Sequence, residues 1–171
     1  MPTLTTPRLK LVPWREEDLD ALHQLWVDPA VRRYLLDDRA ISRDEARTFL
    51  VEALEVAKAT GVTQWTIRRL AAPDELIGFA GLRWLDAAAR QPELMYGLDP
   101  RWWGQGLATE AALAVIDDAF TRLGFQTVWA STDAPNRDSV RVMERLGMTP
   151  SECPWADPKL VVYRVDRGGP Q

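Results

Sequence analysis

The segment DPRWWGQGLATEAA, from Asp99 to Ala112, contains the residues best suited to bind an anion. Gly104 and Gly106 stand directly before a stretch that has the apolar periodicity of a helix. The start of a helix has unpaired backbone N–H groups and a partial positive charge, and glycines let a ligand approach them closely. Together with the guanidinium of Arg101, several such donors suit a pyrophosphate better than a single phosphate. The alternative is that the two glycines only allow a tight turn between a strand and a helix.

Two well-known phosphate-binding loops do not fit this segment. The P-loop has Lys and then Ser or Thr after its last glycine, and GQGLATEA has neither in register. The dinucleotide fingerprint needs glycine at the position of Thr109, although Asp133 follows the next expected strand. The hypothesis of a dinucleotide-dependent oxidoreductase is therefore supported only by the partial glycine pattern and by Asp133.

The elements that must position the glycine segment follow from the pattern of apolar and turn-forming residues. Apolar runs and alternation predict strands at residues 8–14, 62–69, 76–84, 93–98, 127–132 and 159–165. Helical spacing, with capping residues and terminal glycines, predicts helices at residues 15–28, 42–61, 107–124 and 136–147. Linkers that contain Pro73 and Pro92 are expected to separate the middle strands, which form an antiparallel meander. This order predicts a mixed sheet flanked by helices.

Composition excludes several classes of protein. A chain of 171 residues with 46% hydrophobic and 27% charged residues is expected to form one globular domain. The net charge of −4 argues against a nucleic-acid partner, and no window approaches the roughly 18 apolar residues that a membrane span needs. The single cysteine, Cys153, excludes an intramolecular disulfide and favours a cytoplasmic location. The single histidine, His23, argues against a metal site with several histidine ligands, so no metal is expected.

Four motifs, in this order along the chain, resemble the GNAT superfamily of acyl-CoA-dependent N-acyltransferases. They are LTTPRLKLVPW near the start, LIGFAGL in the middle, RWWGQG followed by LATEA, and NRDSVRVMERLGM towards the end. The third motif matches the family pattern of Arg or Gln, two residues, Gly, one residue, and Gly or Ala. The fourth is similar to the Asn-x-x-Ser helix of the ribosomal-protein-alanine N-acetyltransferase (RimJ/RimL-like) branch.

The resemblance implies an α/β (α+β) fold, a mixed, mostly antiparallel twisted sheet flanked by helices. It implies one domain over residues 1–171, with the acceptor side in residues 1–61 and the sheet and acetyl-CoA-binding core in residues 62–171. Acetyl-CoA is the implied co-substrate, and the implied ligands of its pyrophosphate are the backbone amides of Trp103, Gly104, Gln105, Gly106, Leu107 and Ala108, with Arg101 at the entrance. Gly97 and Leu98 would hold the pantetheine arm and polarise the thioester carbonyl, and Asn136 would contact the cofactor. Met95 stands where relatives often have glycine, which leaves the shape of this strand open.

The implied reaction is direct attack of a primary amine on the thioester, which needs a base for the amine and an acid for the leaving thiolate. Glu93 is the first candidate for the base, with a solvent-exposed carboxylate at a strand end as the alternative, and Asp157 is the second candidate. Ser139 is the implied acid; the alternative is that Asn136 and Ser139 only cap the helix.

The acceptor is expected to be an amine on a small molecule or at a protein N-terminus, and homodimers are common among such relatives. Arg137 and Arg141 could meet the 3′-phosphate of CoA, or lie on a solvated helix face. The alternative to an N-acetyltransferase is a non-catalytic acyl-CoA-binding module that keeps the loop but lacks a working base.

Overall fold

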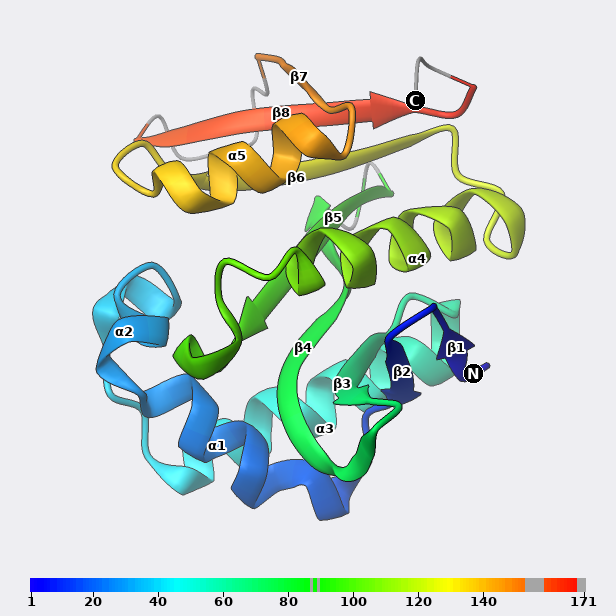
Figure 1. Ribbon diagram of the computed structural model, residues 1–171. Helices are drawn as coiled ribbons and strands as arrows, with labels where there is room; N and C mark the ends of the chain where they lie inside the picture. Colours follow the sequence, from blue (N-terminus) through cyan, green and yellow to red (C-terminus); the bar gives the residue numbers. More distant parts are fainter. Residues whose placement is uncertain (87, 89, 153–158, 169–171) are drawn as a thin grey trace.

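The computed structural model describes residues 1–86, 88, 90–152 and 159–168. Their eight strands form one sheet in the order β1-β2-β3-β4-β5-β6-β8-β7 (Figure 1). The strands are β1 (Leu4–Thr5), β2 (Leu9–Pro13), β3 (Gln64–Arg69), β4 (Ala72–Asp86), β5 (Gln91–Leu98), β6 (Thr127–Asp133), β7 (Thr149–Pro150) and β8 (Leu160–Asp166). The helices are α1 (Leu19–Val27), α2 (Pro29–Arg32), α3 (Arg43–Thr60), α4 (Leu107–Thr121) and α5 (Arg137–Arg145). The predicted fold class, a mixed and mostly antiparallel sheet with flanking helices, is confirmed.

The sheet has a discontinuity between β5 and β6. All other neighbouring strands pair in the antiparallel direction, whereas β5 and β6 run parallel. Within the described residues these two strands share one pair of partners, Glu93 and Trp129. Beyond that pair, the described residues show no further strand pairing along the edge of β5 that faces β6. The parallel step occurs where the chain leaves the sheet through α4, as a crossover connection requires.

The two faces of the sheet bury separate apolar clusters. One cluster packs α4 and α5 on the sheet, and it includes Ala111, Val115 and Ala119 of the predicted helical stripe. The other lies against α1 and α3 and contains Trp26 and Phe79. In Figure 1, α4 and α5 accordingly lie apart from α1 and α3. The glycine segment that precedes α4 is therefore fixed by a helix whose apolar side is buried in the core.

The helix ends follow the sequence signals. Ser42 accepts from the backbone N–H of Glu45, and the Glu45 carboxylate accepts in return from the N–H of Ser42, so α3 begins at the predicted capping box. Gly61 ends this helix in the left-handed conformation, with φ of 81°. Helix α1 ends at Val27 and Pro29 begins α2, which Asp28 caps by accepting from the N–H groups two and three residues later.

Two expectations about the strands were wrong. Pro73 and Pro92 were expected in linkers, but they lie in β4 and β5. Proline fits these places because it needs no donor at an irregular or weakly paired position. Pro73 lies beside the shifted register between β3 and β4, and Pro92 precedes the single pair that joins β5 to β6. The two-residue strands β1 and β7 were not predicted, since two residues carry no alternation.

Within the described residues, no helix combines the length and apolar character that crossing a bilayer requires.

Candidate active site

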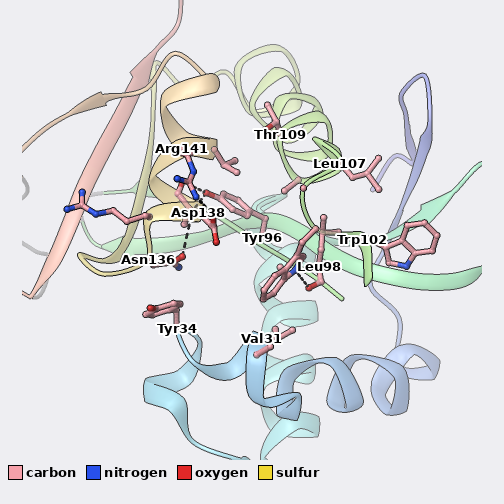
Figure 2. Close-up of a pocket in the computed structure, with 18 of the residues that line it drawn as sticks. Val31, Tyr34, Tyr96, Leu98, Trp102, Leu107, Thr109, Asn136, Asp138 and Arg141 are labelled. Atoms are coloured by element: carbon pink, nitrogen blue, oxygen red, sulfur yellow. Dashed lines mark hydrogen bonds and ion pairs between the residues drawn. The ribbon is translucent and has the colours of Figure 1, made fainter. Parts of the chain in front are cut away.

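A cavity of about 500 Å³ opens where β5 and β6 diverge. Its walls come from the end of β5, the glycine segment, the first turn of α4, the start of α5 and helix α2 with the residues after it. Figure 2 shows Tyr96, Thr109 and Asn136 around this space, with Val31 and Tyr34 on the α2 side. Segments from five parts of the sequence thus meet at one hollow.

Most of the predicted site residues line this cavity. They are Gly97, Leu98, Trp103, Gly104, Gly106, Leu107, Ala108, Asn136 and Ser139. Arg101, Gln105 and Glu93 are not among the lining residues. Asp157, the second candidate for the base, falls outside the described residues.

The glycine segment presents a row of backbone donors. Gly104 and Gly106 have φ of 72° and 74°, a conformation that side chains with a Cβ rarely adopt. A Cβ at Gly104 would meet no atom within 4 Å, so space alone does not require glycine there. Within the described residues, no hydrogen-bond acceptor faces the backbone N–H groups of residues 104–109. Six consecutive donors of this kind, at the positive end of α4, are suited to bind an anion.

Arg101 does not point its charge freely into the cavity. Its guanidinium lies 2.8 Å from the Asp99 carboxylate and 3.6 Å from Glu75. The hydrogen bonds from Arg101 hold the pKa of Asp99 below its usual value. Asp99 also accepts from the backbone N–H of Arg101, so this pair closes the turn that precedes the glycines. Any attraction between Arg101 and a bound anion is weakened by these two carboxylates.

Two tryptophans of the segment face the cavity in different ways. The Trp103 indole N–H donates to the carbonyl of Leu98 at 2.7 Å, and the residue is 47% exposed. The Trp102 ring lies under the Arg69 guanidinium, with 4.0 Å from the guanidinium carbon to the ring centre. The indole N–H of Trp102 is buried without a partner in the described part of the chain. Thr109 Oγ1, at the start of α4, is buried in the same way. Buried polar atoms of this kind are normally paired, so both can serve a ligand.

Tyr96 and Ser139 join the two sides of the cavity. The Tyr96 hydroxyl lies 2.8 Å from the Ser139 hydroxyl and donates to the Ser139 carbonyl at 3.1 Å. Burial raises the pKa of Tyr96 to about 12, although its hydrogen bond with Ser139 acts in the opposite direction. Tyr96 is therefore a neutral donor throughout the physiological range. It was missed in the sequence because Tyr96 and Ser139 are 43 positions apart in the chain.

The start of α5 is capped as one of the sequence alternatives expected. The Asn136 side chain accepts from the Ser139 N–H at 3.3 Å and donates to Thr132 at 2.9 Å. The helix then places Arg137, Arg141 and Arg145 on the cavity wall. Arg141 is paired with Asp138. The spacing of four residues between these arginines was the available signal, and only Arg137 and Arg141 were considered from it.

Glu93 is buried rather than solvent-exposed at a strand end, so that alternative was wrong. The residue is 1% exposed, and its carboxylate accepts from Arg83 Nε at 2.7 Å and from the Ser131 hydroxyl. It lies at the single pair that joins β5 to β6, at the closed end of the divergence. These two donors fix the Glu93 side chain outside the cavity lining, so a contact between Glu93 and a molecule in the cavity would require a bridging water molecule.

Comparisons with known proteins agree with this geometry. The acetyltransferase (GNAT) domain family matches residues 8–149. An uncharacterized N-acetyltransferase of Bacillus licheniformis, p20, is 30% identical over 146 residues, which cover 85% of this chain and 82% of that protein. The crystal structure of an acetyltransferase from Agrobacterium tumefaciens superposes with a TM-score of 0.84 at 27% identity, covering 98% of this chain and 95% of the other.

A more distant structure has the same fold with coenzyme A bound. It is the RimL ribosomal L7/L12 alpha-N-protein acetyltransferase, which superposes with a TM-score of 0.81 at 18% identity over 96% of this chain and 98% of that one. The chain therefore belongs to the GNAT acetyltransferase family and is an acetyl-CoA-dependent N-acetyltransferase.

Proposed function

We propose that the backbone N–H groups of residues 104–109 bind the pyrophosphate of acetyl-CoA, and that the acetyl group passes directly to a primary amine in the same cavity. The observation that carries this proposal is the run of six N–H groups at the start of α4 that find no acceptor in the described part of the chain. A pyrophosphate offers several oxygens with negative charge, which match such a run better than a single carboxylate does. Gly104, Gln105, Gly106, Leu107, Ala108 and Thr109 thus supply the backbone donors. The backbone N–H of Trp103, which was expected to join them, already donates to the carbonyl of Pro100. Arg101 contributes a partly neutralised charge at the entrance.

The pantetheine arm is proposed to lie along β5. Among the described residues, the edge of β5 beyond Glu93 pairs with no strand, so the backbone around Gly97 and Leu98 can pair with the amides of the arm. The Leu98 carbonyl already accepts from the Trp103 indole, so this carbonyl is not free to accept a hydrogen bond from the arm. A Cβ at Gly97 would lie 2.7 Å from the Phe79 ring, so glycine lets β5 pass close to that ring.

Ser139 is proposed as the acid for the leaving thiolate, and Tyr96 is proposed to position the Ser139 hydroxyl. The Ser139 hydroxyl lines the cavity beside Asn136, near the glycine segment. Tyr96 contacts this hydroxyl from the buried side, and its raised pKa keeps Tyr96 protonated, so that it can donate to Ser139 when Ser139 donates to the thiolate. The thiolate accepts a hydrogen bond from Ser139 as the C–S bond breaks, which lowers the barrier for its departure.

Glu93 is proposed as the base, acting through water. An alkylammonium group must lose a proton before its nitrogen can attack, and Glu93 is the carboxylate at the closed end of the divergence. The hydrogen bonds from Arg83 and Ser131 fix its side chain in place. A water chain from the amine to this carboxylate would carry the proton away.

The acceptor is proposed to enter beside α2, in agreement with an acceptor side within residues 1–61. Val31, Tyr34 and Leu35 form the wall opposite α5, and Trp103 offers a half-exposed ring at the same opening. This apolar and aromatic wall suits the body of a small amine or the side chains beside a protein N-terminus.

Calorimetric titration with acetyl-CoA, followed by thiol release with a panel of amines, tests this function. We expect saturable binding and steady release with at least one amine, reduced in Ser139→Ala. No heat of binding at millimolar acetyl-CoA would contradict the site. Binding without release from any amine would favour the alternative of a non-catalytic acyl-CoA-binding module.

A further inference from the structure

The turn between β1 and β2 is tied to the glycine segment by a network of polar contacts. Arg8 Nε donates to one Glu110 carboxylate oxygen at 2.6 Å, and the Arg8 backbone N–H donates to the other at 2.9 Å. The Thr6 hydroxyl also donates to Glu110, at 2.6 Å. Arg8 Nη1 then donates to the carbonyl of Gln105, at 3.0 Å. One guanidinium thus connects the first turn of α4 to the peptide between the two glycines.

The contact with Gln105 determines where a key donor points. A trans peptide directs its C=O and its N–H to opposite sides. Because the Gln105 carbonyl faces Arg8, the N–H of Gly106 in the same peptide unit faces away from Arg8. Gly106 lines the cavity and Arg8 does not. The hydrogen bond from Arg8 therefore holds this peptide with its donor on the side of the anion site.

The segment needs such a restraint because two of its residues are glycines. Gly104 and Gly106 allow many backbone conformations, so an untethered loop would lose much entropy when it orders around a ligand. The Gly106 position at the start of α4 has no side chain to cap the helix. Arg8 supplies the restraint from outside the loop, across about one hundred residues of sequence.

We propose that Arg8 and Glu110 are positioning residues for the coenzyme, which act by holding the 105–106 peptide with its N–H towards the pyrophosphate. This inference rests on the proposed binding of acetyl-CoA at residues 104–109. Glu110 anchors Arg8, and Thr6 anchors Glu110 in turn. Neither Arg8 nor Glu110 touches the cavity, so their effect on the coenzyme passes through the loop.

Substitutions of Arg8 and Glu110 can distinguish an effect on the position of the loop from a direct effect of the Arg8 charge on the anion. If Arg8 acted only by its positive charge, Glu110→Gln would remove a nearby negative charge and tighten the binding of an anion. If the two residues position the loop, Glu110→Gln weakens the anchor of Arg8 and so weakens binding. The two explanations predict opposite signs for the same substitution.

Titration calorimetry with CoA and steady-state kinetics with acetyl-CoA test the proposal in Arg8→Ala, Arg8→Lys and Glu110→Gln. We expect the Kd for CoA and the KM for acetyl-CoA to rise about tenfold in Arg8→Ala and about threefold in Glu110→Gln, with kcat close to wild type. Arg8→Lys should fall between wild type and Arg8→Ala, because an ammonium can pair with Glu110 but lacks the fork that also reaches Gln105.

Arg43→Ala is the matched control. Arg43 pairs with Asp20 through its Nε at 2.6 Å and its side chain is 49% exposed, against 52% for Arg8, but it lies on α3. The control should leave the Kd for CoA unchanged, and thermal melting of each variant shows whether it is folded. Unchanged affinity in folded Arg8→Ala, or tighter binding in Glu110→Gln, would overturn the proposal. If the wild-type protein does not bind CoA, the result would instead refute the proposed function on which this inference rests.

Discussion

Replacing Gly104 by alanine isolates the contribution of backbone shape to coenzyme binding. The residue has φ of 72°, and an added Cβ would meet no atom within 4 Å. Gly104→Ala therefore introduces no collision and no new charge. The change acts only through the preference of alanine for negative φ.

The size of the effect follows from that preference. Holding a residue with a Cβ in the left-handed region costs roughly 1–2 kcal/mol. Gly104 is exposed, so the free loop can relax towards negative φ and avoid this cost. In the proposed complex the coenzyme requires the original backbone, and the cost then appears in the binding free energy. A cost of about 1–2 kcal/mol corresponds to a rise of about 5- to 30-fold in Kd.

Titration calorimetry with CoA on Gly104→Ala and on Gly124→Ala measures this effect with its control. Gly124 has φ of 71° and equally empty surroundings, but it follows the other end of α4. Gly124→Ala should leave the Kd for CoA unchanged, while its loss of thermal stability, if any, should be similar to that of Gly104→Ala. Equal Kd values for wild type and Gly104→Ala would refute the role assigned to the loop backbone.

Three further predictions concern the chemistry. Tyr96→Phe should lower kcat by about 3- to 10-fold with the Kd for acetyl-CoA unchanged, because Ser139 loses one hydrogen-bonding partner. Tyr163→Phe, at a buried position on β8, is the control. Equal kcat values in the two variants would contradict the claim that Tyr96 positions the Ser139 hydroxyl. Glu93→Gln should lower kcat by roughly 100-fold or more without weakening CoA binding, since the amide keeps the shape of the side chain and half-exposed Arg83 can be solvated. An unchanged kcat would show that Glu93 is not the base and only contacts Arg83 and Ser131. Because the pKa of Tyr96 rises from 10.0 to about 12 in the folded protein, the unfolded chain loses this proton first, and the free energy of unfolding should fall by at most about 3 kcal/mol as the pH rises from 10 to 12. Urea unfolding across this range should show a smaller fall in Tyr96→Phe, and parallel curves for the two proteins would contradict the raised pKa.

Local signals predicted the parts of the fold that depend on neighbouring residues. The capping box at Ser42, the stop at Gly61 and the glycines before α4 act within a few residues, so the sequence displays them directly. The fold class followed from the order of these elements. Helix α2 and strands β1 and β7 were missed because two to four residues have no periodicity to detect.

Contacts between distant segments determine the part of the site that the sequence could not reveal. Tyr96 meets Ser139 across the divergence of the sheet, and Arg8 meets Glu110 across 102 residues. The burial of Glu93 depends on Ser131 of β6, which no local pattern places beside β5. Arg101 was expected to serve an anion, but its partner Glu75 comes from β4. Side-chain pairing of this kind is a property of the assembled sheet.

The most direct test of the central claim is a ¹⁵N–¹H NMR titration that follows the backbone amides of residues 104–109. Saturating CoA should shift these amide signals strongly, whereas pantetheine, which lacks the pyrophosphate, should leave them nearly unchanged. Bound CoA with unshifted amides in this segment would contradict the claim that the main chain before α4 holds the coenzyme.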